Sequence, residues 1–330
     1  MPRTNPHRPF TPHPELMERA PEVSGNAING LGETERRNAR MVYWAPDPDD
    51  IPHGEMQRWF YTRDPDDPHI KKAREDRVWR LAGEIGPLAD RRVERSPEEW
   101  TTALLGLPGT MELEMIGVAK MRPEYLIEGR SAPETRVIAI GVAHDYDEIS
   151  TAPKTRAGAE VLKQYGRAGA AAKSVATWLR AQGWDARAVT GPMTGDLLMI
   201  PPAIAAGLGE LGKHGSMISA EYGASFRLAA VLTDAPFAPT GPAELGVDDF
   251  CASCRICEDA CPPEALFPDK QTVRGEEKWY VDFDKCLPFF NQHQGCSICI
   301  AICPWSRPGV GLNLAEKLAR KRERVAAEAD

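Results

Sequence analysis

Runs of apolar residues divide the middle of the chain into alternating strands and helices. Residues 136–142, Arg-Val-Ile-Ala-Ile-Gly-Val, form a short β-branched run that favours a buried strand over a helix. Residues 158–182 are rich in alanine and are followed by Gly183, as expected of a helix with a glycine after its last turn. Residues 186–189 and 226–233 are two further apolar strands. The pattern predicts an α/β or α+β body.

Polar residues on either side of this body indicate where it begins and how the chain continues beyond it. Residues 96–99, Ser-Pro-Glu-Glu, combine an N-cap serine, a first-turn proline and early acids, which predicts a helix running toward Leu105. Residues 314–330 are strongly charged, which is typical of a solvated helix. The folded body is therefore expected to begin near residue 96.

The N-terminal region is rich in proline. Residues 1–70 hold 11 of the 29 prolines, which disfavours long regular elements. Aromatic residues are interleaved with these prolines, so the segment is expected to be an extended arm packed on the body rather than free disorder. Such an arm can shape a pocket or an oligomer contact.

Composition and charge narrow the classes of partner. With 330 residues, 42% of them hydrophobic, the chain can bury a sizeable core. A formal net charge of −8 disfavours a nucleic-acid surface, and no apolar stretch approaches the ~20 residues of a membrane helix. The first 20 residues contain neither an apolar segment nor a twin-arginine pair in front of one. We therefore expect a cytoplasmic protein with neither a nucleic-acid nor a membrane partner.

All eight cysteines lie in the last quarter of the chain, in two runs that each end in proline. The first run has the form C-x2-C-x2-C-x3-C-P and the second C-x9-C-x2-C-x3-C-P. Thiolates at this spacing can reach adjacent irons of one cube, and soft sulfur suits iron. The runs therefore predict two [4Fe–4S] clusters. Their ligands are Cys251, Cys254, Cys257 and Cys261 in the first run, and Cys286, Cys296, Cys299 and Cys303 in the second.

The two runs are expected to exchange their fourth cysteines. In two-cluster ferredoxins three closely spaced thiolates hold one cluster, and the fourth of the run crosses to the other cluster. One cluster is then held by Cys251, Cys254, Cys257 and Cys303, and the other by Cys286, Cys296, Cys299 and Cys261. The alternatives are weaker, because disulfide frameworks belong to small secreted domains and a zinc ribbon would leave the fourth cysteine of each run without a role.

The glycines of residues 207–215 form a second motif. Residues 207–212 have G-x-G-x-x-G spacing but follow Pro201-Pro202 and a predicted helix rather than a strand, which disfavours a dinucleotide site. Flexible glycines and backbone N–H groups suit the close approach of a large planar or anionic ligand. A glycine-rich turn without a ligand is the other interpretation of the same spacing.

Several stretches of the chain resemble corrinoid-dependent reductive dehalogenases, and together they cover about residues 110–308. The similar stretches are residues 207–234, residues 144–153, the helix that runs from Tyr165 to residues 183–184, residues 295–305, and both cysteine runs. Epoxyqueuosine reductases share the glycine segment and the cysteine runs. The segments around Asp145 and Tyr165 favour the dehalogenase branch.

The resemblance implies a nitroreductase-like α/β core that binds base-off cobalamin, and a ferredoxin-like domain that holds two [4Fe–4S] clusters. The chain has no Asp-x-His-x-x-Gly motif, which agrees with a cobalt that lacks a protein histidine. The expected domains are an arm over residues 1–95, the core over 96–245, the cluster domain over 246–308 and a charged helix over 309–330. The residues implied at the corrinoid are Gly207, Gly209, Gly212, His214 and Gly215.

The resemblance also implies a tyrosine that supplies a proton while reduced cobalt acts on the carbon–halogen bond. Its position corresponds to Tyr165, and the cation that stabilises the phenolate corresponds to Arg227, with Lys213 as a less favoured choice. A core tyrosine and a structural ion pair are the alternative interpretations. His144 and His214 are more typical of buried or loop histidines than of catalytic acids.

The expected partners follow from the same resemblance. Respiratory members carry a twin-arginine leader and a membrane-anchor partner, so the sequence looks like a cytoplasmic, non-respiratory member with a separate low-potential donor of the ferredoxin or flavodoxin type. The expected substrate is a small organohalide, although residues 191–196 lack the pocket asparagine of some members. An oligomer is compatible with the sequence. Three functions stay open: dehalogenation, reduction of another substrate such as epoxyqueuosine in tRNA, and electron or corrinoid carriage without catalysis.

Overall fold

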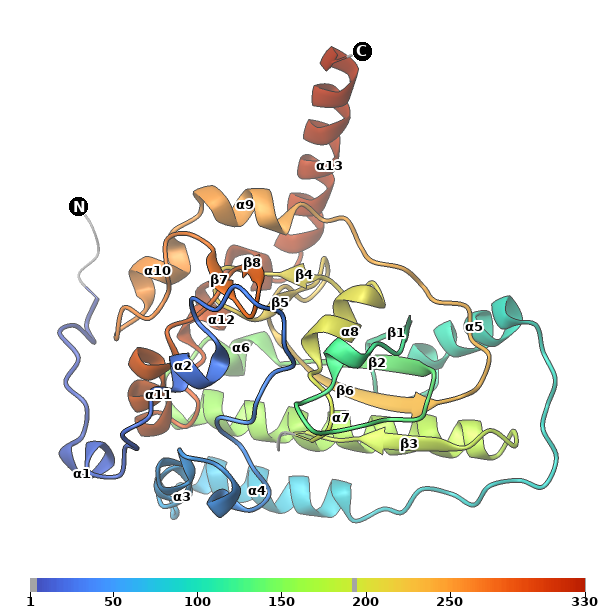
Figure 1. Cartoon of the computed structure of the whole chain (residues 1–330), viewed down its shortest axis with the longest axis horizontal. Helices are drawn as coiled ribbons and strands as arrows, with labels where there is room; N and C mark the ends of the chain where they lie inside the picture. The colour runs from blue at the N-terminus through green and yellow to red at the C-terminus, as the bar shows by residue number, and fades with distance from the viewer. Residues whose placement is uncertain (1–4, 192–194, 330) are drawn as a thin grey trace.

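A four-stranded antiparallel sheet forms the centre of the computed structural model, which describes residues 5–191 and 195–329 (Figure 1). The strand order is β1 (Met115–Lys120), β2 (Arg136–Ala143), β6 (Phe226–Thr233) and β3 (Ala186–Val189). Residues along β2 are buried from one end to the other, because helices cover both faces of the sheet. The three strands predicted from the apolar runs are confirmed.

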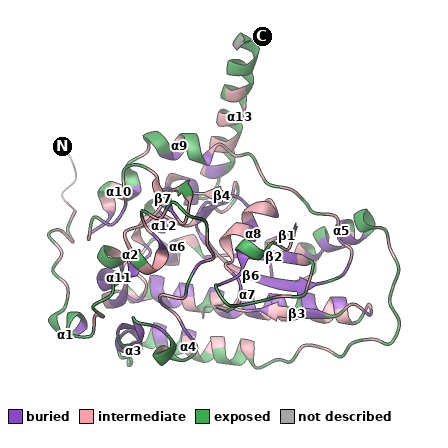
Figure 2. Ribbon diagram, viewed as in Figure 1, coloured by how far each residue is buried: buried purple, intermediate pink, exposed green. Residues whose placement is uncertain are grey.

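The long helix α7 (Thr155–Arg180) lies along one face of this sheet and confirms the predicted alanine-rich helix. Its small side chains, including Ala168 and Ala172, let the helix approach the strand residues Ile138 and Val231 closely, and all four are buried in one core. Both β2 and β3 pair antiparallel with β6, so β2 and β3 run parallel, and α7 is the crossover between them. Figure 2 shows buried residues concentrated on the sheet and on the helix face against it.

A short helix, α8 (Ile200–Ala205), packs near β1 and β2 in a second core. A Cβ added to Gly117 of β1 would lie 2.2 Å from the Ala206 carbonyl oxygen, so only glycine fits there. After α8 the chain forms a small hairpin from β4 (Glu210–Leu211) and β5 (Met217–Ile218), which holds the glycine segment.

The predicted helix after residue 96 is α5 (Pro97–Leu105), and it begins with a reciprocal cap. The Glu99 backbone N–H donates to Ser96 Oγ at 3.2 Å, and the Ser96 backbone N–H donates to Glu99 Oε2 at 2.8 Å. Shorter turns follow it along the chain in the core. These are η2 (Leu107–Gly109), η3 (Pro123–Tyr125) and α6 (Tyr146–Ile149).

The N-terminal 95 residues contain more helix than their prolines suggested. The helices are α1 (Pro14–Met17), α2 (Gly25–Asn29), η1 (Pro48–Asp50), α3 (Gly54–Tyr61) and α4 (Pro68–Leu81). Proline can begin a helix as well as break one. In α4, Asp67 is the N-cap residue and Pro68 lies in the first turn. Helix α4 packs along α7, as Figure 1 shows.

The first described residues bond to the far end of the chain. The Arg8 guanidinium donates to the Cys261 carbonyl oxygen at 2.6 Å and to the Glu258 carbonyl oxygen at 3.1 Å. The Asn5 side-chain amide donates to the Ala260 carbonyl oxygen at 2.9 Å. These bonds satisfy carbonyls at the end of a short helix that carries cysteines.

The cysteine-bearing region is a set of short helices and one hairpin. Its elements are α9 (Val247–Ser253), α10 (Ile256–Ala260), β7 (Gln271–Val273), β8 (Glu276–Lys278), α11 (Phe283–Gln292), α12 (Ile298–Ile302) and η4 (Pro304–Ser306). The chain then enters α13 (Val310–Ala329), which begins four residues before the charged helix predicted from residue 314 and projects from the body (Figure 1). Its base packs on the cluster region through Leu314 and Leu318, and much of the rest is exposed.

Among the described residues, none of the helices has the length and apolar character needed to cross a bilayer.

Candidate functional site

Tyr165 and Arg227 lie together where α7 passes the end of the central sheet. The Arg227 guanidinium carbon is 5.2 Å from the centre of the Tyr165 ring, within the range of a cation–π contact. Sheet register places Arg227 on β6 opposite Val142 of β2. Its Nε is buried and has no hydrogen-bond partner among the described residues. The two residues implied by the resemblance, Tyr165 and Arg227, are therefore neighbours. The Arg227 Nε–H at this contact is a hydrogen-bond donor without a partner among the described residues.

His144, directly after β2, lies beside this pair. Its backbone N–H donates to the Ser225 carbonyl oxygen at 2.9 Å, and its Nδ1 is 3.3 Å from Ser225 Oγ. Burial, with the Arg227 charge as a second cause, holds the pKa of His144 well below its usual range. The ring is therefore neutral near pH 7, and its buried Nε2 has no partner in the described part of the chain.

A buried polar network fixes the turn of α7 that carries Tyr165. Glu160 Oε1 accepts hydrogen bonds from the Asp145 backbone N–H at 2.7 Å and from Gln164 Nε2 at 2.6 Å. Arg167 donates to Gln164 Oε1 at 2.9 Å and to the Ala143 carbonyl oxygen at 3.3 Å. Because these bonds join the helix to the end of β2, Tyr165 and Arg227 are held in one relative position.

The N-terminal arm reaches the same place, which the sequence analysis did not foresee in detail. Burial raises the pKa of Tyr61, the cations of Arg77 and Arg74 lower it, and Tyr165 raises it. A Cβ added to Gly166, the residue after Tyr165, would lie 3.0 Å from the Cα of Arg77. The aromatic residues among the arm's prolines were the available signal for this contact.

The glycine segment is explained largely by its own packing. Gly207 and Gly215 have φ angles of +82° and +74°, which favour glycine. A Cβ on Gly209 would lie 2.1 Å from the Ile218 carbonyl oxygen, and one on Gly212 would lie 2.6 Å from Ile218 Cδ1. The glycine spacing is therefore accounted for without a ligand, and corrinoid contact by these glycines stays a prediction.

His214 is a better indication of a ligand than the glycines around it. Its Nδ1 accepts the Ser216 backbone N–H at 3.2 Å, and burial lowers its pKa to about 4. Its buried Nε2 has no partner among the residues that the structure describes. Together with the unpartnered nitrogens of His144 and Arg227, this nitrogen fits a polar ligand buried in the core.

Lys213 lies elsewhere than beside Tyr165. Its ammonium is 3.7 Å from Glu258 Oε2 and 5.0 Å from the centre of the Trp279 ring, and the side chain is 2% exposed. Both contacts belong to the cysteine-bearing region. Arg227, rather than Lys213, is the cation that faces Tyr165.

All eight cysteines are free thiols, so no disulfide framework is present. Burial raises the pKa of Cys257 to about 12, and its nearest charged neighbours in order of effect are Cys303, Cys251 and Cys254. These four thiols are the set expected for one cluster.

The remaining four cysteines also lie near one another. Burial raises the pKa of Cys286, and Cys296 and Cys261 raise it further. Burial raises the pKa of Cys299 as well, with Cys296 and Cys286 as the next causes. Iron–sulfur clusters are held by cysteine thiolates, so binding of a cluster here would require these buried thiols to lose their protons.

The thiols of each set are neighbours, but they do not form a site for a single metal ion in the described part of the chain. No group of three or more histidine, cysteine or acidic side chains in the described residues is close enough to hold one metal ion. A cube of four irons holds its thiolates further apart than one ion does. The donor set consists of thiols alone, in two sets of four, and such a set fits iron–sulfur clusters.

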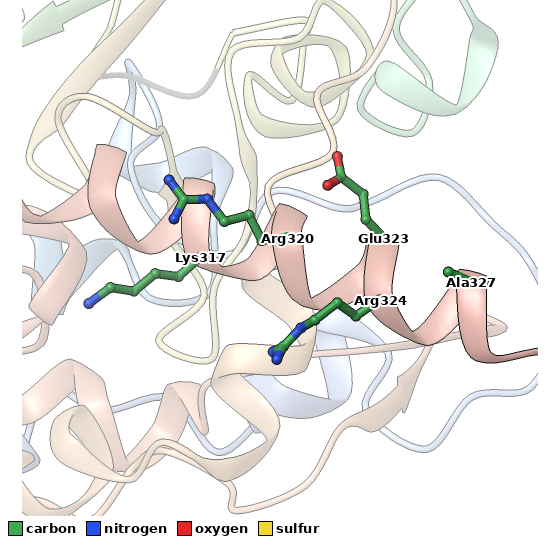
Figure 3. Close-up of a pocket in the computed structure, with 5 residues that line it drawn as sticks. All are labelled: Lys317, Arg320, Glu323, Arg324 and Ala327. Atoms are coloured by element: carbon green, nitrogen blue, oxygen red, sulfur yellow. The ribbon is translucent and has the colours of Figure 1, made fainter.

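A surface hollow at the projecting helix is not part of this site. Figure 3 shows that all of its labelled lining residues belong to α13. The lining residues are Lys317, Arg320, Glu323, Arg324 and Ala327.

Comparison with known proteins agrees with the arrangement of the cysteines. The family described as "4Fe-4S dicluster domain" matches residues 250–306. The tetrachloroethene reductive dehalogenase of Desulfitobacterium hafniense is 35% identical over 208 residues, which cover 59% of this chain and 37% of that protein. The chain is related to the reductive dehalogenases. Epoxyqueuosine reductase of Leadbetterella byssophila is 30% identical over 118 residues, which cover 31% of this chain and 34% of that protein.

The fold is that of a reductive dehalogenase, as the sequence predicted. A solved structure described as a reductive dehalogenase that "suggests a mechanism for B12-dependent dehalogenation" superposes with a TM-score of 0.74 at 22% identity. The superposition covers 94% of this chain and 48% of that one. The chain thus spans less than half the length of the relatives it matches. Residues 192–194, in the stretch where some members place a pocket asparagine, lie outside the described residues.

Proposed function

We propose that this chain is a corrinoid- and iron–sulfur-dependent reductase that removes halide from a small organohalide. The observation that carries the proposal is the contact between Tyr165 and Arg227 in a chain that also holds two cysteine runs. The net reaction takes two electrons and one proton, breaks the carbon–halogen bond, and yields a carbon–hydrogen bond and a halide ion. The chain must therefore deliver electrons and supply a proton.

Two [4Fe–4S] clusters would deliver the electrons. One is held by Cys251, Cys254, Cys257 and Cys303, and the other by Cys286, Cys296, Cys299 and Cys261. The neighbour relations among the thiols support this crossed assignment. A separate low-potential donor of the ferredoxin or flavodoxin type supplies the electrons to the clusters, and we place the protein in the cytoplasm.

A base-off cobalamin would occupy the core, and the residues proposed to hold it are those of the glycine segment. These are Gly207, Gly209, Gly212, His214 and Gly215. When bound, the corrinoid supplies the low-potential metal centre at which the carbon–halogen bond is broken. The unpartnered Nε2 atoms of His214 and His144 are available as donors or acceptors to a polar group of the ligand.

Tyr165 would donate the proton to the substrate carbon. Loss of that proton leaves a phenolate, and the Arg227 guanidinium at 5.2 Å from the ring stabilises the negative charge. The network of Glu160, Gln164 and Arg167 keeps the helix turn fixed while this occurs. Tyr61 from the arm lies near Tyr165.

The test is replacement of Tyr165 with Phe after anaerobic reconstitution with iron, sulfide and cobalamin. The wild-type chain should bind about eight irons and one cobalt and release halide from an organohalide. The Tyr165→Phe protein should keep the metals and lose turnover. Tyr125→Phe is the control, because Tyr125 is a buried tyrosine that lies in a different core from the partly buried Tyr165.

Other outcomes would point to other functions. Turnover of Tyr165→Phe at the wild-type rate would remove Tyr165 from the mechanism. Iron without cobalt would leave an electron-transfer protein. Reduction of epoxyqueuosine in a tRNA stem loop, in place of halide release, would identify the second function, which the match to epoxyqueuosine reductase supports.

A further inference from the structure

Lys213 is a buried cation in a region where the proposed clusters would bring negative charge. It follows the Gly212 of the glycine segment, and a tight turn holds its backbone through a hydrogen bond from the Gly212 N–H to the Ser216 carbonyl oxygen at 2.9 Å. Its side chain is among the largest that are fully buried in the described part of the chain. Burying an ammonium is costly, so a compensating interaction is expected.

The contacts of Lys213 offset only part of the cost of burying its ammonium. Glu258 Oε2 is 3.7 Å from the ammonium and accepts no hydrogen bond from any described residue. The other oxygen of Glu258 accepts a hydrogen bond from Arg255 at 2.7 Å. One carboxylate is therefore shared by two cations, and the Trp279 ring provides only its π face. A positive charge remains to be balanced.

The groups next to Lys213 that can balance it are thiols of one cysteine set. The Trp279 ring that the Lys213 ammonium contacts packs in one core with Cys251 and Cys303. Glu258 itself sits directly after Cys257 in α10. Lys213 thus faces the first cysteine set, and Arg227 faces Tyr165.

We propose that Lys213 sets the reduction potential of the cluster held by Cys251, Cys254, Cys257 and Cys303. Reduction adds one electron and therefore one negative charge to the cluster. A fixed positive charge in a buried, weakly screened position stabilises the reduced form more than the oxidised form, which raises the potential. Lys213 then acts through the cluster, by setting its reduction potential, and takes no part in the bond-breaking step. This inference rests on the proposed cluster binding.

The chain offers a matched control for the loss of charge. Lys270 lies over the same Trp279 ring, at 5.7 Å from its centre, but pairs with Asp248 at 2.6 Å and has a side chain that is 31% exposed. Solvent and its own carboxylate screen that charge. Removing Lys270 therefore changes the formal charge by the same amount without removing a buried, incompletely paired cation.

The experiment is a redox titration of the reconstituted holoprotein, followed by the electron paramagnetic resonance signals of the reduced clusters. Lys213→Met should shift the midpoint of one cluster to a more negative potential by at least about 59 mV, a tenfold change in the one-electron equilibrium. The other cluster should keep its midpoint. Lys213→Arg should stay close to the wild type, and Lys270→Met should shift neither cluster.

A second variant tests the same electrostatics in the opposite direction. Glu258→Gln removes the partner carboxylate, so it should raise the midpoint of the same cluster. If Lys213→Met does not retain its iron, Glu258→Gln is the variant that tests the role of Lys213. Unchanged midpoints in iron-replete Lys213→Met, or in Glu258→Gln where the first variant loses iron, would overturn the role of Lys213. A wild-type chain that binds no iron would instead overturn the proposed function.

Discussion

Replacing Arg227 with Met should slow halide release strongly while the cofactors stay bound. The guanidinium carbon is 5.2 Å from the centre of the Tyr165 ring, and in the proposed mechanism its charge stabilises the phenolate left after proton donation. At this separation and an effective dielectric constant of about 20, the attraction is at most about 3 kcal/mol. If all of it is expressed in the transition state, the rate falls by roughly 100-fold.

The assay is anaerobic halide release by the reconstituted protein with a chemical reductant in excess, so that the natural donor is not needed. Arg227→Lys serves as the conservative variant and should recover part of the rate, because it restores charge without the planar guanidinium. The double variant Arg227→Met with Tyr165→Phe should be no slower than Tyr165→Phe alone, since the two residues act on one proton. An unchanged kcat in cofactor-replete Arg227→Met would refute the reasoning.

Three further predictions concern stability and metal binding. Ser96→Ala should lower the free energy of unfolding by about 1 kcal/mol, measured by denaturant titration, because the cap on α5 is lost. Burial lowers the pKa of His214 from 6.5 to about 4, so the unfolded chain binds a proton that the folded chain does not. The free energy of unfolding should therefore fall by roughly 3 kcal/mol as the pH drops from 6.5 to about 4. His214→Gln should make the free energy of unfolding less dependent on pH in this range. An equal pH dependence in both proteins would contradict the prediction. Cys303→Ser should weaken the same cluster signal as Cys254→Ser, and loss of the other signal would contradict the crossed assignment.

The fold of the core could be predicted from local patterns because those patterns are strong there. Most residues of the apolar runs that became β2 and β6 are buried, and the capping residues of α5 act within one turn. The order of the strands was not predictable in the same way. Insertion of β6 between β2 and β3 depends on contacts between residues more than 40 positions apart, which no local period encodes.

The candidate site was predictable only where residue type and spacing carry the chemistry. The cysteine runs satisfy this condition, and the resemblance named Tyr165 and Arg227, which the fold brings together. The place of Lys213 was not predictable, because its neighbours Glu258 and Trp279 come from distant segments. The proximity of Tyr61 to the site depends on the docking of α3 and α4. These helices were not predicted, because the prolines of the arm disfavoured regular elements.

The bonds from Arg8 to α10 and to the loop after it have a consequence for the order in which the protein can mature. Arg8 and its partner Cys261 are 253 positions apart along the chain. Closing so long a loop is slow compared with forming the helices and hairpins in between. We therefore expect the loop after α10 to stay open until the arm docks on it, and docking of the arm to be the step that closes it. A bulky affinity tag near Arg8 would interfere with that step, whereas one beyond the projecting α13 would not.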